Sequence, residues 1–289
     1  MIIRECKPEE WDNFVTGSPN GTLFSTSQWI GLFCKPYQIY GAYKNNELVG
    51  GIAGFIEEGQ DTFKSWGSLT PFMGVLIKDT TGMNYPARCS LENEVATSLI
   101  EYLTREYRTI DITNHYTFTD IRPFLWNKFM PSVKYTYVLP LNDMEAVWFN
   151  IEKDTRYEIN HAEKEGVEVE TGTMREFLSV YNTMWKRKGM VSPQPDEFFL
   201  EMDRIIKPDI LMVDSAVGTV MMHDNKRAYY ILGASDAPNL SAYCLWEAIK
   251  QEYNNGIREI DFVGANNHDI ALYKRGFGGQ LTPYYEVKV

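Results

Sequence analysis

A loop in the second half of the chain carries residue types that suit proton transfer. Asn266, Asn267 and His268 follow a short apolar run that begins at Ile260. Loops at strand ends carry function more often than the strands themselves, and an imidazole titrates near neutral pH. His268 is therefore a candidate general base, with Asn266 and Asn267 as candidate substrate-binding residues. The alternative for His268 is an exposed loop residue without a chemical role.

Three further residues are candidates for substrate binding. The planar guanidinium of Arg156 suits a phosphate or carboxylate, although Arg156 also has Glu152 four residues earlier and could form an ordinary helix ion pair with it. Tyr229 and Tyr230 alternate across a predicted strand, so one faces the core and the other a surface or cleft. Trp66 ends the corresponding strand of the first half. Trp66 and Tyr230 complete the candidate set.

Other chemistries lack a signature in this sequence. No Gly-x-Ser-x-Gly segment, Ser/His/Asp arrangement or carboxylate pair indicates a hydrolase. The cysteines have neither Cys-x-x-Cys spacing nor a histidine at zinc spacing, so no metal site is predicted. The net charge of -11 argues against general binding of DNA, RNA or anionic membranes. A local basic groove stays open as an alternative, because Lys186, Arg187 and Lys188 are consecutive.

The composition describes a globular protein with room for two domains. The chain has 289 residues, of which 44% are hydrophobic and 14% aromatic, so a sizeable core can form. The first residues lack the apolar core of a signal peptide, and no apolar run approaches the roughly 20 residues of a membrane span. We therefore expect a reduced, cytoplasmic protein without a transmembrane segment.

One order of motifs occurs twice. In each half an Ile-Asp pair begins a strand, an Asp-Ile pair follows, and a short helix and a closing strand come next. The first copy is Ile110-Asp111, Asp120-Ile121 and a strand over 135–139; the second is Ile260-Asp261, Asp269-Ile270 and a strand over 283–287. Two similar halves packed together create a cleft, and clefts are where ligands bind.

Hydrophobic periodicity and turn residues extend this duplication to nearly the whole chain. Each half is predicted to contain a strand, helices, a three-stranded antiparallel meander, a helix, a strand, a helix and a strand. A long helix, capped by Asn142 or Asp143 and ended by Gly166, joins the halves. The predicted domains are residues 1–141 and residues 142–289, the second including the linker helix.

This order of elements resembles the GNAT acyltransferase fold, and two copies in one chain resemble the FemABX family. The predicted fold class is therefore α/β (α+β), with two tandem GNAT-like domains whose mixed sheets are flanked by helices. Four segments carry the resemblance: Leu23-Phe24-Ser25-Thr26-Ser27-Gln28-Trp29, the run from Arg156 to Val167, Ile260-Asp261-Phe262-Val263-Gly264, and Tyr273-Lys274-Arg275-Gly276-Phe277-Gly278-Gly279.

The resemblance implies an N-acyltransferase that moves an aminoacyl or acyl group to an amine of a cell-envelope, amino-sugar or amino-acid precursor. The donor would be aminoacyl-tRNA or acyl-CoA, with tRNA as a possible partner and a small-molecule or nucleotide-linked substrate as acceptor. In that family the motif lysine, here Lys274, lies at the cleft, where a cation neutralises a phosphate or an oxyanion. Lys274 is thus a candidate catalytic residue; the alternative is a lysine exposed on a helix beside Arg275.

Two departures from the family pattern leave other functions open. The chain lacks a charged coiled-coil arm, and Pro71 to Ile77 stands where Fem proteins often have Gly-Pro and an acidic residue. Neither half has the glycine-rich turn that holds the pyrophosphate of CoA on a helix N-terminus, which predicts weak acetyl-CoA binding. The alternatives are a CoA-dependent N-acetyltransferase acting on a nucleotide-linked amino sugar, and a non-catalytic ligand-binding relic of the fold.

Overall fold

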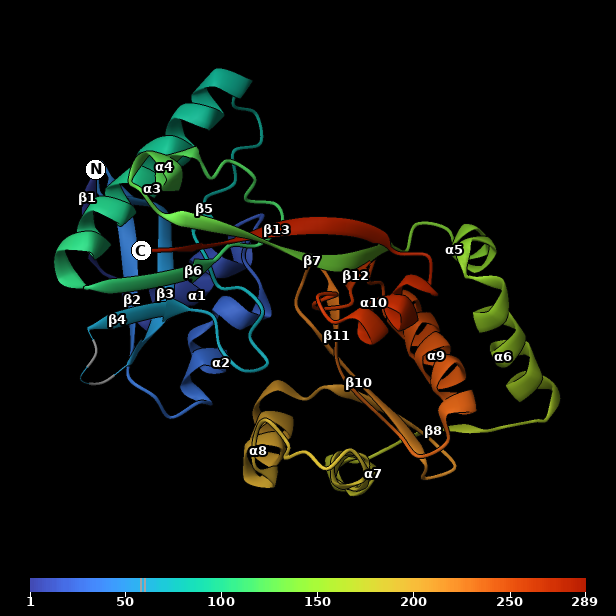
Figure 1. Ribbon diagram of the computed structural model, residues 1–289. Helices are drawn as coiled ribbons and strands as arrows, with labels where there is room; N and C mark the ends of the chain where they lie inside the picture. Colours follow the sequence, from blue (N-terminus) through green and yellow to red (C-terminus); the bar gives the residue numbers. More distant parts are fainter. Residues whose placement is uncertain (58, 60) are drawn as a thin grey trace. The chain divides into compact units, whose positions relative to one another are not determined.

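The computed structural model describes residues 1–57, 59 and 61–289 and divides into two compact units. Unit 1 consists of Met1–Lys134 together with Pro283–Val289, and unit 2 consists of Tyr135–Thr282. Figure 1 labels the elements of both. The units differ from the predicted domains at their ends, because the last seven residues of the sequence belong to unit 1 and residues 135–141 belong to unit 2.

Unit 1 is built on a mixed sheet with the strand order β1-β2-β3-β4-β6-β13 and a short strand, β5, paired to β3. All neighbours are antiparallel except β4 and β6, which are parallel. The strands are β1 (Ile2–Glu5), β2 (Tyr37–Lys44), β3 (Glu47–Glu57), β4 (Thr62–Ser65), β5 (Leu76–Ile77), β6 (Thr109–Thr113) and the second part of β13 (Gln280–Lys288). The helices are α1 (Pro8–Gly17), α2 (Ser27–Gly31), α3 (Tyr85–Glu106) and α4 (Arg122–Trp126).

Helices cover both faces of the unit 1 sheet (Figure 1). Two successive glycines of β3 show this, since neighbouring residues of a strand point to opposite faces. A Cβ on Gly50 would lie 2.5 Å from Val95 of α3, whereas a Cβ on Gly51 would lie 2.6 Å from Trp11 of α1. Glycine at both positions lets the two helices pack closely against the strand.

Unit 2 repeats the same sheet with the order β8-β9-β10-β11-β12-β7. Its neighbours are antiparallel except β11 and β12, which are parallel. The strands are β8 (Val169–Thr171), β9 (Asp209–Val213), β10 (Val217–His223), β11 (Ala228–Ser235), β12 (Glu259–Asp261) and the second part of β7 (Met130–Pro140). The helices are α5 (Met144–Asn150), α6 (Lys153–Lys164), α7 (Met174–Arg187), α8 (Asp196–Ile206), α9 (Ser241–Asn254) and α10 (His268–Arg275).

The faces of the unit 2 sheet are also covered by helices from both sides. Val217 of β10 belongs to the same core cluster as Leu245 of α9. The next residue, Gly218, points the other way, and a Cβ there would lie 2.6 Å from Phe177 of α7. The strands that begin at Ile110 and Ile260 thus occupy equivalent places in their sheets, which confirms that prediction of the repeated motif order.

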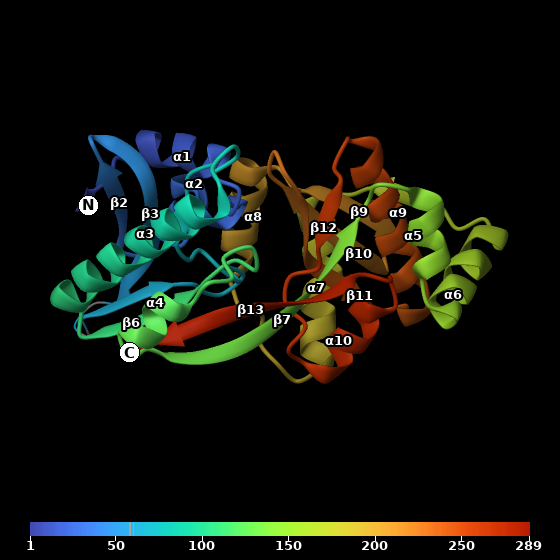
Figure 2. The same ribbon diagram turned by 90° about the horizontal axis from the view of Figure 1, so that it is seen from above.

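The two closing strands are exchanged between the repeats. The strand over 135–139 was predicted to close the first repeat, yet residues 138–140 of β7 pair with β12 of unit 2. The last strand, β13, pairs with β6 of unit 1, with Val287 opposite Ile112, and its arrow ends beside β6 (Figure 2). Each sheet is therefore completed by a strand that lies in the other half of the sequence.

The predicted linker helix is two helices. Asp143 caps α5 as expected, but α5 ends at Asn150, and Ile151 has extended backbone angles before α6 begins. Ile151 is buried in the unit 2 core, and Glu152 N donates to Gly276 O at 2.8 Å. Packing of this apolar residue and the new hydrogen bond offset the helical bonds lost at the break. Helix α3 begins at Tyr85, where the Asn84 side chain caps it by accepting from Ala87 N.

No helix in the described part of the chain is both long and apolar enough to cross a membrane.

The strand exchange predicts which sheet a core substitution near the C-terminus will destabilise. Val287 is fully buried in the unit 1 core. Val287→Ala should lower the unfolding free energy by about 1–3 kcal/mol. Hydrogen exchange should increase in β6, and not in β12. Increased exchange in β12 with β6 unchanged would contradict the assignment of β13 to the first sheet.

Candidate functional site

The parallel pairing between β11 and β12 stops early. Only Ala228 with Ile260 and Tyr229 with Asp261 are in register. Strand β11 continues to Ser235, so most of its length has no partner on that side in the described register. Such an opening at the carboxyl end of parallel strands is a common place for a ligand site in α/β proteins.

The chain after β12 follows β7 and leaves β11. Phe262 N donates to Tyr137 O at 2.9 Å, which continues the ladder with β7. Val263 and Gly264 then adopt left-handed backbone angles, with φ of 54° and 77°. This conformation is strained for a β-branched residue such as Val263. The surrounding structure must therefore hold the turn in place.

Lys274 holds this turn. Its Nζ donates to Val263 O and to Gly264 O, both at 2.8 Å, and the side chain is buried. The ammonium also lies 5.8 Å from the centre of the Tyr230 ring. Burial lowers the pKa of Lys274 to about 8, while the charge of Asp261 opposes the shift. The exposed-helix alternative for Lys274 is thus excluded, whereas a catalytic role stays a prediction.

The Asp261 carboxylate also stabilises this turn. It is fully buried, and Oδ1 accepts hydrogen bonds from Thr136 Oγ1 at 2.5 Å and from Val263 N at 2.8 Å. Burial raises the pKa of Asp261 to about 6, and the two hydrogen bonds oppose that shift. Lys274 and Asp261 explain why the two sequence motifs that contain them occur together: one motif forms the turn and the other clamps it.

A cavity of about 170 Å³ lies along the unpaired part of β11. Backbone and side chains of β10, β11, α7, α9 and α10 line it. The lining residues are Met184, Val217, Gly218, Thr219, Tyr230, Gly233, Ala234, Ser235, Ser241 and Tyr273. None of these residues is acidic or basic, and five of them carry a hydroxyl group.

Two tyrosines form the polar wall of the cavity. Tyr273 OH donates to Ser241 O at 3.1 Å, and the Tyr230 and Tyr273 side chains are hydrogen-bonded to each other. Burial raises the pKa of both tyrosines well above their usual value, so both are neutral at pH 7. A Cβ on Gly233 would lie 2.0 Å from Tyr230 OH, so a glycine is needed where this hydroxyl sits.

A β-bulge lies next to Tyr230. Val220 of β10 pairs with Leu232 and Met221 pairs with Tyr230, which leaves Ile231 without a partner in the register. Bulges free a backbone amide and carbonyl from the ladder and often occur beside active sites. The hydroxyl groups and the first residue of α9 therefore gather polar groups around one small cavity, and the bulge at Ile231 lies between two of its lining residues, Tyr230 and Gly233.

The corresponding opening in unit 1 is filled by the chain itself. All four residues of β4 pair with β6. Beyond them, Met73 N donates to Ser65 O at 3.1 Å, and Gly74 N donates to Thr113 O at 3.0 Å. Even one methyl group on Gly74 would lie 2.5 Å from Asn114 Cα. The segment that departs from the Fem pattern thus lies between the ends of β4 and β6.

Arg156 is placed at the break between α5 and α6. Its Nη1 donates to Phe149 O at 2.6 Å and to Trp148 O at 3.3 Å, in the last turn of α5, where Trp148 O also accepts from Ile151 N at 3.3 Å. Glu152, which could have paired with Arg156, instead forms an ion pair with Arg275 at 3.3 Å. Arg156 also lines a shallow cavity of about 610 Å³ with aromatic residues of α5. It shares none of these partners with Lys274.

Trp66 lies in unit 1, at the end of β4. Its ring contacts two ammonium groups, Lys64 at 5.9 Å and Lys288 at 5.7 Å from the ring centre. Lys288 in turn pairs with Asp111 at 3.0 Å. Trp66 Nε1 is buried without a hydrogen-bond partner among the described residues. A substrate-binding role for Trp66 stays a prediction.

The loop before α10 uses its polar residues in local structure. Asn266 Oδ1 accepts from Tyr135 N at 2.9 Å, which extends the contact with β7. Asn267 caps α10 by accepting from the backbone N–H groups of Asp269 and Ile270. The His268 side chain is 82% exposed and lies 3.0 Å from Asp269 Oδ1. His268 is the first residue of α10 and not a loop residue, and chemical roles for Asn266, Asn267 and His268 stay predictions.

The hypothesis of a clamp at Lys274 predicts a loss of stability on its removal. Lys274→Met keeps the aliphatic stem but leaves Val263 O and Gly264 O without a donor. The unfolding free energy should fall by about 1.5–3 kcal/mol, as measured by urea denaturation. The matched control is Lys153→Met on exposed α6, which should change stability little. Equal effects of both changes would show that the buried ammonium does not hold the turn.

The pKa of Lys274 also predicts a pH dependence. Because the folded-state pKa is about 8 and the usual value is 10.5, the unfolded chain binds more protons between these two pH values. The contribution of Lys274 to the unfolding free energy should therefore rise with pH across that window. Stepwise urea denaturations should show wild type gaining stability relative to Lys274→Met. A difference that stays constant across the window would contradict the lowered pKa.

Comparison with known proteins concerns the fold. No family model and no curated protein matches this sequence. Among solved structures, FemX matches with a TM-score of 0.71 and 13% identity, over 99% of this chain and 97% of FemX. L-PGS from Bacillus licheniformis matches with a TM-score of 0.60 and 13% identity, over 98% of this chain and 92% of L-PGS. A tandem GNAT protein from the clavulanic acid biosynthesis pathway matches with a TM-score of 0.53 and 9% identity, over 100% of this chain and 98% of that protein. The chain therefore has the tandem GNAT-like fold of FemABX-type acyltransferases, as its sequence motifs predict.

Proposed function

We propose that the protein is an N-acyltransferase whose reaction takes place in unit 2. The observation that carries the proposal is the cavity along the unpaired part of β11, beside the bulge at Ile231. Its position along the part of β11 that is not paired with β12 fits an acyl chain that enters alongside the sheet. Similarity to FemX and to tandem GNAT proteins supports this choice of reaction class.

The groups around the cavity suit the tetrahedral intermediate of acyl transfer. An amine nitrogen attacks the acyl carbon, a C–N bond forms, and the bond to the leaving oxygen or sulfur breaks. The N-terminus of α9, whose first residue Ser241 lines the cavity, and the hydroxyl groups of the lining residues are candidate donors for the oxyanion. Neutral Tyr230 or Tyr273 can donate one proton to the leaving group and regain a proton from solvent. Since no carboxylate lines the cavity, water takes the proton of the amine.

Unit 1 is the less suitable half for this chemistry. Its equivalent opening contains the backbone of Met73 and Gly74, which is hydrogen-bonded to both flanking strands. An acyl group would have to displace this segment and break those bonds. We therefore assign to unit 1 a role other than acyl transfer.

Basic residues near the cavity rim suit a donor with phosphate groups. Arg187 Nη2 donates to Ser235 O at 2.8 Å, Ser235 lines the cavity, and Arg187 Nη1 forms an ion pair with Asp236 Oδ1 at 2.8 Å. Lys186 and Lys188 flank Arg187 in the sequence, and guanidinium and ammonium groups bind phosphate. Acyl-CoA and aminoacyl-tRNA share this chemistry. The acceptor we propose is an amine of a cell-envelope or amino-sugar precursor, met in the cytoplasm.

Donor turnover tests this function. The protein is incubated with acyl-CoA thioesters in one arm and with total aminoacyl-tRNA in the other, each with a panel of amines, and release of free CoA or deacylated tRNA is measured. Tyr273→Phe should lower turnover by about 100-fold or more, because a donor to the reacting atoms is lost. The matched control is Tyr243→Phe. Tyr243 OH donates to Val167 O at 3.2 Å, away from the cavity.

The two arms identify the donor, and the variants locate the site. Turnover with acyl-CoA alone would establish the CoA-dependent alternative. Equal turnover of wild type and both variants would place the reaction elsewhere. No turnover in either arm, with no thermal stabilisation by either donor, would overturn the proposal and favour the non-catalytic relic.

A further inference from the structure

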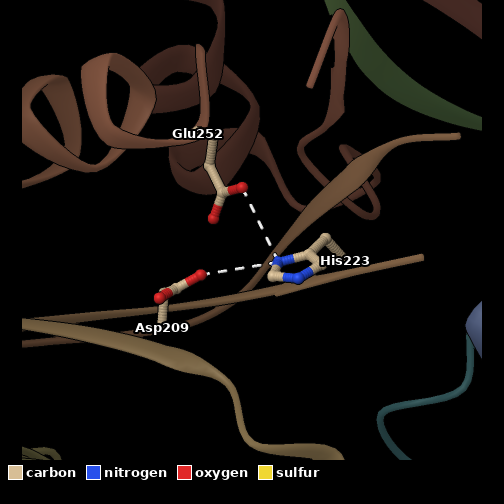
Figure 3. Close-up of side chains that lie close together, drawn as sticks. All are labelled: Asp209, His223 and Glu252. Carbon is tan, nitrogen blue, oxygen red and sulfur yellow. Dashed lines mark ion pairs between the residues drawn. The ribbon is translucent and has the colours of Figure 1, made fainter. Parts of the chain in front are cut away.

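Three residues with metal-binding side chains meet at one end of the unit 2 sheet. Asp209 is the first residue of β9, His223 is the last residue of β10, and Glu252 lies in the last turn of α9. The antiparallel register places Asp209 opposite Met221, close to the end of β10. Figure 3 shows the three side chains pointing toward one another from the helix and the two strands.

The distances from His223 match those between two ligands of a shared ion and are long for hydrogen bonds. His223 Nδ1 lies 3.4 Å from Asp209 Oδ2 and 3.7 Å from Glu252 Oε2. Hydrogen bonds between nitrogen and oxygen are shorter, at about 2.7–3.2 Å. Two ligands of a tetrahedral ion with bonds of about 2.1 Å are about 3.4 Å apart. One ligand atom from each of the three residues lies within 4.8 Å of the other two.

Glu252 is the observation that points to a ligand. Its side chain is only 1% exposed, yet neither carboxylate oxygen has a hydrogen-bond partner among the described residues. Burying an unsatisfied carboxylate is costly unless a cation or donor compensates it. Both carboxylates approach the same ring nitrogen of His223 (Figure 3), which has at most one hydrogen to donate. A proton on this nitrogen therefore cannot serve both.

We propose that Asp209, His223 and Glu252 bind one divalent transition-metal ion of the zinc type. Neutral imidazole and carboxylate oxygen are regular zinc ligands, and two carboxylates balance the charge of the ion. The Asp209 and His223 side chains are 30% and 42% exposed, so the ion can enter from solvent and keep a water molecule as a fourth ligand. Gln251 Nε2 donates to Asp209 Oδ1 at 3.0 Å and orients that ligand.

The ion would fasten one end of α9 to the sheet. Glu252 lies near the C-terminal end of this helix, where the helix dipole favours a cation. Ser241, at the opposite end, lines the proposed acyl cavity. The metal site is therefore separate from the proposed reaction and acts on the structure of unit 2. It does not depend on the proposed function.

Metal titration of the full-length protein tests the site. After treatment with a chelator, the protein is titrated with Zn²⁺ by calorimetry and with Co²⁺ by visible absorption spectroscopy. We expect one ion per chain, a tetrahedral d–d spectrum without a thiolate charge-transfer band, and a higher melting temperature. Absence of that band separates this site from the four cysteines.

Substitutions that remove a metal ligand but keep a polar side chain connect binding to these residues. Glu252→Gln and His223→Gln should each weaken Zn²⁺ binding about tenfold or more. The matched control is His161→Gln. His161 Nε2 lies 3.9 Å from Glu165 Oε1 in an exposed pair of side chains on the surface of α6. This variant should bind Zn²⁺ like wild type. Circular dichroism of the metal-free forms verifies folding. If Glu252→Gln does not fold, the test rests on His223→Gln, which changes a partly exposed residue.

Two outcomes would overturn the proposal. One is the absence of saturable binding at one ion per chain, in which case the three residues form an ion-pair cluster around a protonated histidine. The other is binding that His223→Gln and Glu252→Gln leave unchanged, which would assign the ion to other residues.

Discussion

The buried ammonium of Lys274 is the interaction on which the candidate site depends. It satisfies the carbonyls of Val263 and Gly264 in a left-handed turn that β-branched residues seldom adopt. That turn takes the chain away from β11 and keeps it on β7. Without the turn, β12 could continue along β11, and the space along the unpaired edge of β11 would close. By holding this turn, Lys274 keeps the edge of β11 unpaired, and the cavity lies along that edge.

The two repeats have the same strand order but differ in the space beyond their parallel strand pair. Their strand orders and the single parallel pair in each are the same. They differ in the structure beyond the end of that pair. In unit 1 the chain around Met73 and Gly74 returns between the strands and uses their hydrogen-bonding groups. In unit 2 a bulge and two tyrosines take that place and leave a small polar cavity. The two units therefore share a strand order but differ in what occupies the space beyond their parallel pair.

Sequence reasoning predicted the fold well because it rests on local patterns. Strand alternation, turn residues and the repeated Ile-Asp motif were enough to order the elements and to place Ile110 and Ile260 in equivalent strands. Partners distant in sequence were beyond its reach. The exchange of closing strands, the helix break at Ile151 and the approach of Glu252 to His223 depend on tertiary packing. Tyr273 was overlooked although it adjoins Lys274, since a charge attracts notice and a buried hydroxyl has no sequence signal.

The exchange of closing strands also has a consequence for the order of folding during synthesis. The first sheet needs β13, which is translated after every strand of the second sheet, so β6 keeps an open edge while those strands emerge from the ribosome. An unpaired apolar edge is a template for wrong pairing. In the second repeat, by contrast, the closing strand β7 has already been translated when β12 is made. The C-terminal repeat can therefore mature first, which reverses the usual vectorial order from the N-terminus.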